Sequence, residues 1–231
     1  MSTIRKNLMA VITIIAMTFS TAAFAGNIGF GVTGSAIAIS GEGAETEASN
    51  TGSEESHQKA NASNNTSIVS MFAEYTFDIY NGVTFGLDYI PGAAKVNSRV
   101  MQRSETAEGK GALGDSSGAT DYKAQAEVEN HLTAYAEVAV FEGLFLTAGL
   151  TSMDVITLES GNTNSGAYGN KTLNGKMIGL GYKGAFSDNL FYKVSGNYTD
   201  YDSFSLTSSS SNSISAELDT LKASFSMGFR F

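Results

Sequence analysis

Residues 221–231 at the end of the chain alternate strictly between apolar and polar or small side chains. A period of two predicts a β-strand with one apolar face and one polar face. A soluble domain seldom exposes an edge strand this apolar, because the strand would invite aggregation. The apolar positions are Leu221, Ala223, Phe225, Met227, Phe229 and Phe231. The pattern therefore favours a strand whose apolar face is covered by lipid.

The same alternation recurs along the chain and predicts about eight strands. The second strand shows it most clearly, with Val69, Met71 and Tyr75 on one face and Ser70 and Glu74 on the other. The fourth strand places Val128 on the apolar face and Glu127 and Glu129 on the polar face. The expected strands are 27–40, 68–80, 83–90, 122–141, 144–157, 171–186, 190–202 and 214–231.

The connections between these strands alternate between long and short. Asn81-Gly82 is a strong signal for a two-residue hairpin, and Glu142-Gly143 predicts a second tight turn. A third short turn is expected at 187–189. The long connections are 41–67, which is acidic, 91–121, 158–170 and 203–213. Outer-membrane barrels have this asymmetry, with short periplasmic turns and longer external loops. A hairpin hidden in 91–121 would raise the strand count to ten.

The N-terminal residues have the features of a secretory signal peptide. Arg5 and Lys6 precede an apolar stretch, and Ala23-Phe24-Ala25 offers a small-x-small cleavage site before Gly26. We therefore expect residues 1–25 to be a cleaved export signal and residues 26–231 to form one outer-membrane domain. In that domain no stretch reaches the ~18–20 apolar residues of a spanning helix, so a closed barrel remains as the way to satisfy the backbone in lipid.

Composition narrows the possible partners and cofactors. The chain has a formal net charge of −9, which disfavours nucleic acid as a partner because phosphate binding needs a basic face. It has no Cys, so thiolate metal sites and disulfides are excluded. The two histidines, His57 and His131, lie on different predicted elements and do not suggest a metal site. We predict no cofactor and no metal.

Charged residues on the polar, inward faces segregate by strand. Strands two to four carry acidic side chains and strands six to eight carry basic ones, so the two groups face each other across an eight-stranded ring. Buried charges need partners, and an eight-stranded barrel is narrow enough to be filled by side chains. Independent solvation of each charge in a wet lumen is the alternative. The expected pairs are Asp78 with Lys183, Asp88 with Lys193, and Glu137 with Arg230.

The terminal Phe, the strand count and the loop asymmetry resemble the small eight-stranded bacterial outer-membrane β-barrels, the family of OmpA transmembrane domains, OmpX and opacity-type proteins. The resemblance implies an antiparallel up-and-down transmembrane barrel in the cell outer membrane, surrounded by outer-membrane lipid and lipopolysaccharide. It also implies a surface or structural role with limited permeability. The terminal strand would be the signal that the barrel-assembly machinery reads, through Phe225, Met227, Phe229 and Phe231.

Three classes of function remain open at this stage. The first is a non-enzymatic barrel with a largely plugged lumen that displays acidic loops at the cell surface, in envelope structure, adhesion or surface binding. The second is a narrow porin-like channel for small or apolar solutes. The third, a lipid-modifying enzyme or protease, would need a set of catalytic side chains around His131, and no particular Ser is selected. Gly29-Phe-Gly31-Val-Thr-Gly34 matches a dinucleotide-binding motif but lies within an alternating strand.

A soluble lipocalin-like barrel has the same strand periodicity with its apolar face turned inward. The export signal, the terminal Phe231 and the loop asymmetry favour the membrane barrel instead. On the last strand, Glu217 and Asp219 share the outward parity just before Leu221. This places the outer membrane surface near Thr220 and leaves about eleven residues to cross the membrane, as a tilted strand requires.

Overall fold

The computed structural model describes residues 26–48, 54–77, 82–95, 101–105, 120–160, 169–207 and 213–231, and these residues form an all-β structure. No helix among them is long and apolar enough to cross a membrane. The predicted signal peptide lies outside the described residues. The strands are β1 (Gly26–Ala48), β2 (Glu54–Phe77), β3 (Val83–Ile90), β4 (Ala94–Lys95), β5 (Met101–Glu105), β6 (Thr120–Phe141), β7 (Leu144–Ser160), β8 (Lys171–Ala185), β9 (Leu190–Tyr201), β10 (Phe204–Thr207) and β11 (Ser213–Arg230).

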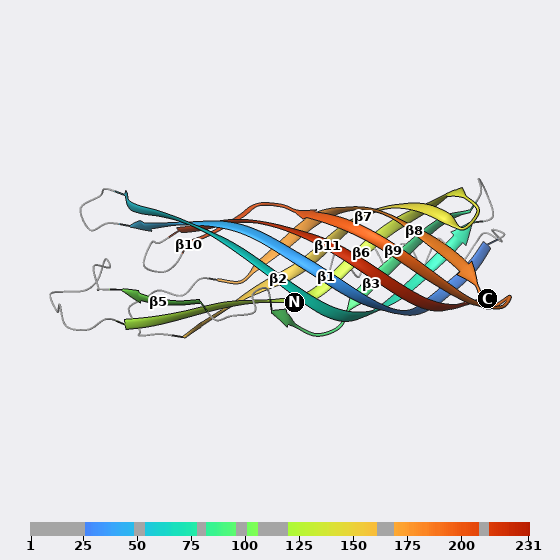
Figure 1. Ribbon diagram of the computed structural model, residues 1–231, viewed down its shortest axis with the longest axis horizontal. Coiled ribbons are helices and arrows are strands. Elements are labelled where there is room, and N and C mark those ends of the chain that lie inside the picture. The colour runs from blue at the N-terminus through green and yellow to red at the C-terminus, as the bar shows by residue number, and fades with distance from the viewer. Residues whose placement is uncertain are drawn as a thin grey trace, which may run out of the picture.

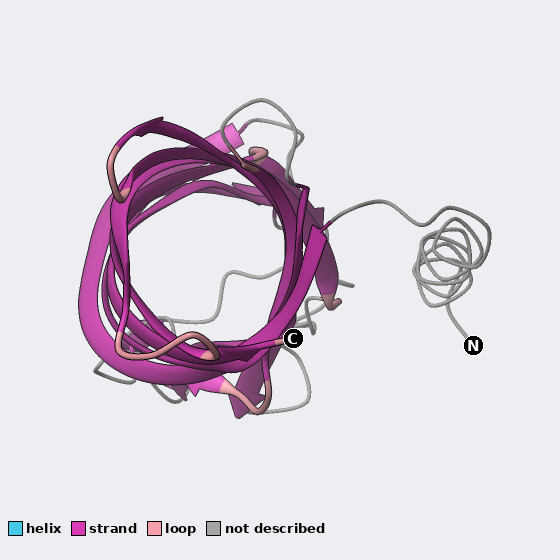
Figure 2. Ribbon diagram, turned by 90° about the vertical axis from the view of Figure 1, so that its right-hand side faces the viewer, coloured by secondary structure: helices cyan, strands magenta, loops and turns pink. Residues whose placement is uncertain are grey.

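Eight of these strands form the wall of a closed antiparallel barrel. Neighbours pair in the order β1, β2, β3, β6, β7, β8, β9 and β11, and β11 pairs back with β1 to close the ring (Figure 2). Strands β4 and β5 pair with β6, and β10 pairs with β11, so these three short strands extend the wall without adding to the ring. The predicted fold class is confirmed, with eight strands and not ten.

The short turns lie where the sequence predicts them. Gly82 and Gly143 have φ values of +84° and +73°, which residues with a side chain rarely adopt. The third short turn joins β8 to β9. These turns share one end of the barrel with the C-terminus, at the right of Figure 1, whereas β5 and β10 lie at the opposite end.

The first long connection is shorter than the sequence predicts. The sequence predicts a loop over 41–67, but β1 and β2 continue their ladder through Thr46 and His57 to the pair Ala48 and Glu54, with a register shift after Thr46. The extension does not depend on apolar side chains that face lipid. Once the membrane part of the hairpin has set the register, backbone hydrogen bonds can continue the ladder through a segment rich in Ser, Asn and Gly. The two strands therefore continue beyond the apolar part of the wall. In Figure 1 they reach the left end of the barrel, where β5 and β10 also lie.

A belt of apolar side chains covers the outside of the barrel. Val69, Leu150 and Ile178 are each more than 60 % exposed, and the residues that alternate with them point into the lumen. Near the short turns, aromatic side chains pack beside one another, for example Phe77 against Phe85 and Phe30 against Phe231. The apolar face is outside, so the lipocalin-like alternative is wrong and the belt is the surface that faces lipid.

Above this belt the polarity of the two faces is reversed. On β7 the outward residues change from Leu150 to Asp154, while the inward residues change from Thr147 to Met153 and Val155. On β11 the outward residues make the same change between Leu221 and Asp219, where the sequence places the outer membrane surface, and the inward Leu218 is buried. The inward side chains form an apolar core of Met153, Val155, Leu173, Tyr201 and Leu218, with Ile39, Val128 and Phe204 packed against it. The external part of the barrel is thus built like a water-soluble one.

One β-bulge changes the facing of the upper part of β6. The register between β6 and β7 shifts between Glu129 and Leu132, and Asn130 has a φ value of +53°. Because a bulge inserts one residue, it reverses the parity of everything beyond it. Val128 therefore points inward and packs against the apolar core. The prediction that Glu127 and Glu129 face the lumen is wrong, since the alternation now turns both outward.

The belt can be tested on a single strand. Leu180 lies in the middle of the belt on β8, and Asn174 is exposed on the same face beyond the belt. We expect Leu180→Arg to lower the free energy of unfolding by about 2–4 kcal/mol, because a charge at the bilayer midplane is poorly solvated. Asn174→Arg should change it by less than about 1 kcal/mol. Urea unfolding in lipid vesicles measures both, and equal losses would contradict the assigned belt.

Candidate functional site: a charge cluster across the lumen

Four charged side chains from four strands meet inside the inner half of the barrel. Glu74 comes from β2, Glu137 from β6, Lys183 from β8 and Lys193 from β9. All four occupy inward positions of their strands, because each alternates with residues of the lipid belt. Strands β2 and β6 lie on one side of the ring and β8 and β9 on the other. The charges that the sequence segregates by strand therefore do face each other across the lumen.

Each lysine bridges both glutamates. Lys193 Nζ lies 2.6 Å from Glu74 Oε2 and 3.0 Å from Glu137 Oε1. Lys183 Nζ lies 2.9 Å from Glu74 Oε1 and 3.4 Å from Glu137 Oε2. Tyr135 adds a hydrogen bond by donating its hydroxyl to Glu74 Oε2 at 3.0 Å. We call these five residues the charge cluster. Two cations and two anions make it neutral as a whole, which offsets the cost of burying each charge.

Aromatic rings enclose the cluster. Lys193 Nζ lies 4.6 Å from the ring centre of Phe72, and Lys183 Nζ lies 5.3 Å from that of Phe191. Both rings are almost completely buried and contact each other edge to face. Cations over aromatic faces are attracted by the ring quadrupole, most strongly where water is excluded. The rings therefore hold the lysine heads in place and fill the lumen beside them.

Glycines make room for the side chains that cross the lumen. A Cβ atom added to Gly86 of β3 would overlap the ring of Tyr135, and one added to Gly228 of β11 would overlap the ring of Phe191. Both positions face inward and can hold an aromatic ring directly against the backbone. The filled lumen thus depends on small residues in the wall as much as on the large residues that fill it.

Two of the predicted pairings are wrong and the third lies outside the described residues. Lys193 pairs with Glu74 and Glu137 in place of Asp88, whose Oδ2 accepts a hydrogen bond from Ser70 at 2.8 Å. Arg230 does not pair with Glu137, because its Nε donates to the backbone oxygen of Asp188 at 2.9 Å, in the turn between β8 and β9. The proposed partner of Lys183, Asp78, is not among the described residues. Lys183 itself is in the charge cluster.

The errors have a geometric cause. Counting residues from each turn gives a depth along the strand, but barrel strands are tilted by roughly 35–45° and staggered by the shear. Side chains at equal counts are therefore at different heights. A lysine can also reach several ångströms along the axis. The sequence identified Glu74 as an inward charge but did not choose it as a partner, although it is the residue that both lysines share.

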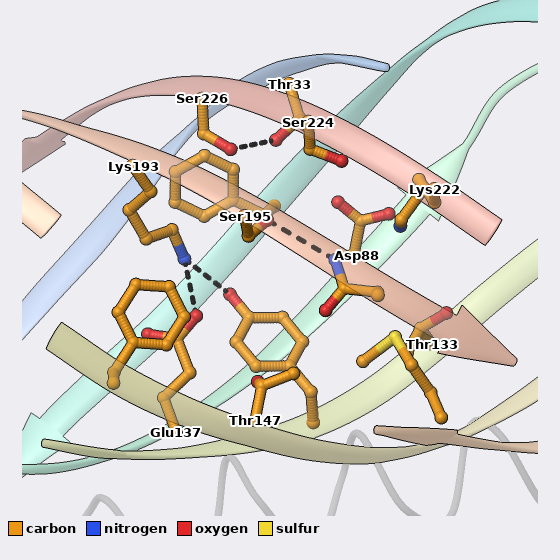
Figure 3. A pocket seen from close by; sticks show the side chains of 15 residues that line it. Thr33, Asp88, Thr133, Glu137, Thr147, Lys193, Ser195, Lys222, Ser224 and Ser226 are labelled. Carbon is orange, nitrogen blue, oxygen red and sulfur yellow. Dashed lines mark hydrogen bonds and ion pairs between the residues drawn. The ribbon is translucent and has the colours of Figure 1, made fainter. Parts of the chain in front are cut away.

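Small spaces lie on both sides of the cluster. On the side of the short turns, a vestibule of about 250 Å³ is lined by Thr84, Glu137, Lys183 and Arg230. On the external side, a polar chamber of about 50 Å³ is lined by hydroxyl, amide and charged side chains together with Phe72, Phe145 and Met177, and it holds at most a few waters. Figure 3 shows this chamber, in which Lys193 reaches Glu137 from the opposite wall and Lys222 points toward Asp88. Hydroxyl pairs such as Thr33 with Ser226, at 2.8 Å, line its wall.

The structure describes His131 and the glycine motif of β1 but not the side chain of His57. His131 Nε2 lies 3.0 Å from Tyr201 Oη and 3.0 Å from Thr151 Oγ1, and no carboxylate is among its hydrogen-bond partners in the described structure. The side chain of His57 is not among those described. Gly29 and Gly31 face the lumen within β1, with no helix after them, so the dinucleotide-binding reading is not supported. No group of His, Asp and Glu in the described part of the chain could hold a metal ion.

The energetic weight of the charge cluster can be measured by removing one charge and then two. We expect Lys193→Met to lower the free energy of unfolding by about 3–5 kcal/mol, because it leaves two buried carboxylates with a single cation. Adding Glu74→Gln should recover part of that loss, since the pair is then removed together. Asp88→Asn serves as the control for a buried carboxylate outside the cluster. Strictly additive losses in urea unfolding would show that Lys193 and Glu74 are not coupled.

No protein-family model matches this sequence, and no curated protein matches it. Solved structures do resemble it. They include the attachment invasion locus protein Ail of Yersinia pestis (13 % identity, TM-score 0.35, 87 % of this chain and 99 % of that one). The outer-membrane protease OmpT of Escherichia coli is 10 % identical, with a TM-score of 0.43 over 92 % of this chain and 99 % of that one. The outer-membrane protein AlkL is 17 % identical, with a TM-score of 0.44 over 92 % and 93 %.

At these identities and scores the three likenesses concern architecture only and say nothing about activity. The structure of the chain itself is more informative. It has a ring of eight antiparallel strands, an apolar belt facing outward, aromatic side chains near the short turns, and a charged and filled lumen. The protein is an integral β-barrel of the outer membrane, with the architecture of the small eight-stranded outer-membrane barrels.

Proposed function

We propose that the protein is a non-enzymatic outer-membrane barrel with a closed lumen, which acts through its external end at the cell surface. The charge cluster is the observation that carries this proposal. Its lysines and glutamates span from one side of the ring to the other and are surrounded by buried aromatic rings. A barrel closed in this way is suited to structure, adhesion or surface binding more than to the passage of solutes.

Opening the lumen would require the cluster to separate. An ion that passed through the lumen would have to move Lys193 away from both Glu74 and Glu137. Both glutamates are less than 10 % exposed. Leaving such charges unpaired inside the barrel costs several kcal/mol. The separation must also displace Tyr135, which donates a hydrogen bond to Glu74. Spontaneous opening should therefore be rare.

The external end offers the surface for a partner. Strands β1 and β2 continue for several residues beyond the apolar belt, and at roughly 3.4 Å per residue this lifts their tips well above the membrane. The outward side chains there include acidic residues such as Glu42, Glu217 and Asp219. We propose that this acidic end faces the surroundings of the cell, with lipopolysaccharide around its base. Delivery to the membrane would use the terminal strand as the signal for the assembly machinery.

The environment of His131 supports the absence of catalysis. A nucleophilic triad needs a base that is oriented by an acidic side chain and reaches a nucleophile near the surface. His131 is instead held by two hydroxyl groups, from Tyr201 and Thr151, within the barrel. We therefore assign it a role in packing and hydrogen bonding.

Conductance across a planar bilayer tests the closed lumen. We expect the wild-type protein to show no steady ion current, and the double variant Glu74→Ala with Lys193→Ala to show one, because it removes two long side chains without changing the net charge. Lys222→Ala removes a lysine from the same lumen but outside the cluster and should stay closed. A steady current through the wild-type protein would instead establish the narrow channel.

The non-enzymatic assignment has a separate test in cells. We expect outer-membrane lipid composition and proteolysis of an added peptide to be the same with the wild-type protein, with His131→Ala and with no protein. The two hydroxyl partners of His131 explain this expectation, since they do not supply a base–acid pair. An activity that is present in the wild type and lost in His131→Ala, with the variant still folded, would overturn it.

A further inference from the structure

The vestibule occupies the inner end of the lumen, between the charge cluster and the short turns. It has a volume of about 250 Å³, and its lining includes Gly82 and Gly143 of two short turns together with Glu137 of the cluster. A smaller cavity of about 70 Å³ shares Lys183 and Arg230 with it. Short turns face the periplasm in outer-membrane barrels. The vestibule is therefore a pocket at the periplasmic end of the barrel.

Arg230 brings unused hydrogen-bond donors to the vestibule. It occupies an inward position near the end of β11, and its Nε donates to the backbone oxygen of Asp188 at 2.9 Å. A guanidinium group has five N–H donors, and this contact uses one of them. The two terminal nitrogens have no acceptor among the described residues. An arginine held in this way presents a planar fork that suits a planar anion.

Lys183 brings a second cation to the same space. Its ammonium group lies 2.9 Å from Glu74 Oε1 and 3.4 Å from Glu137 Oε2, so one of its three donors remains. The side chain of Lys183 is 24 % exposed, against 7 % for that of Lys193, and it lines both inner cavities. Because the charge cluster is neutral as a whole, Arg230 adds a net positive charge on its inner side.

Much of the remaining lining is apolar. The hydroxyl groups of Thr76 and Thr84 bond to each other at 2.8 Å. The apolar side chains of the vestibule are those of Ala139, Leu144, Phe145 and Ala185. They come from β6, β7 and β8, whereas Arg230 comes from β11, two places further around the ring from β8. A ligand of the vestibule therefore needs both an anionic group and an apolar part.

We propose that the vestibule binds a small carboxylate from the periplasm, a monoanion with a compact apolar part. The guanidinium of Arg230 binds the two carboxylate oxygens, the ammonium of Lys183 adds a second positive charge beside them, and the apolar part lies against Ala139 and Leu144. A few placed polar groups in a largely apolar concavity are the usual composition of a small-molecule site. The single positive charge in excess matches a monoanion better than a dianion such as phosphate.

The volume of the vestibule limits the size of the carboxylate. An apolar cavity of roughly 150 Å³ takes a benzene molecule, so about 250 Å³ accommodates a benzene ring that carries one carboxylate. Benzoate is therefore a suitable probe. A long-chain carboxylate would extend out of the vestibule into water, where the additional carbons bury no further apolar surface.

Glycine amides provide a direct measurement of binding. Gly143 and Gly184 line the vestibule, whereas Gly34 and Gly196 lie on the lipid-facing side of β1 and β9. With ¹⁵N-glycine-labelled protein in lipid nanodiscs, we expect benzoate to shift the Gly143 and Gly184 signals saturably and to leave those of Gly34 and Gly196 unchanged. Equal, non-saturating changes at all four amides, or no change at any of them, would show that no site exists.

The chemistry of the ligand is tested by comparing probes. Benzyl alcohol has the same ring without a charge, and inorganic phosphate has charge without an apolar part. Each should bind at least tenfold more weakly than benzoate. If benzyl alcohol binds as tightly as benzoate, the proposed ion pair is wrong, and if phosphate does so, the proposed apolar contact is wrong.

Two basic residues of the lumen give a matched pair of variants. Arg230 lines the vestibule, and Lys222 lines the polar chamber on the external side of the charge cluster. Arg230→Gln should weaken benzoate binding at least tenfold, because it removes the donor fork, and Lys222→Gln should change it less than twofold. Binding by Arg230→Gln within twofold of the wild type would overturn the proposal.

Filling the vestibule provides a second variant that leaves every charge in place. Ala139 lines the vestibule, and Ala134 is exposed on the lipid-facing side of the same strand. Ala139→Phe should abolish saturable binding of benzoate, and Ala134→Phe should leave it unchanged. Equal effects of the two would place benzoate outside the vestibule. The bilayer conductance of the wild type does not depend on this result, so the carboxylate site and the closed lumen can fail separately.

Discussion

The whole structure depends on the absence of water inside a lipid bilayer. Backbone N–H and C=O groups that cross the membrane have no solvent to bond to, so each must find a partner in the protein. The first and last wall strands meet this requirement by pairing with each other, from Gly29 with Arg230 up to Thr46 with Ser213. Closure is thus obligatory, and it fixes the narrow lumen in which every other feature of the barrel lies.

In a lumen this narrow, the inward charged side chains must also pack against one another. Side chains from opposite walls touch, so the inward charges cannot remain independently hydrated as they would in a wide pore. Glu74 and Glu137 are shared between Lys183 and Lys193, and aromatic rings fill the space around the lysines. In the function we propose, the same contacts that stabilise the barrel also close its lumen. Stability and low permeability would then be consequences of one arrangement, and the function would lie at the external end.

The reversal of polarity above the belt explains how the wall can continue outside the membrane at the external end. Once the wall leaves lipid, outward residues must meet water and inward residues can be apolar. Met153, Val155 and Leu218 then form a core like that of a soluble barrel. This core stabilises the projecting strands. A wall that was apolar outside along its whole length could not stand above the membrane.

Local periodicity and the need to satisfy the backbone in lipid were enough to predict the strands, the short turns, the closed barrel and the segregation of inward charges. The sequence did not determine the pairs in the charge cluster, since strand tilt and shear decide which side chains share a height. Nor did it reveal the bulge at Asn130, where one inserted residue turns Val128 inward. It also missed the length of the projecting strands. These depend on contacts between strands far apart in the chain, and only the closed tertiary structure brings those strands together.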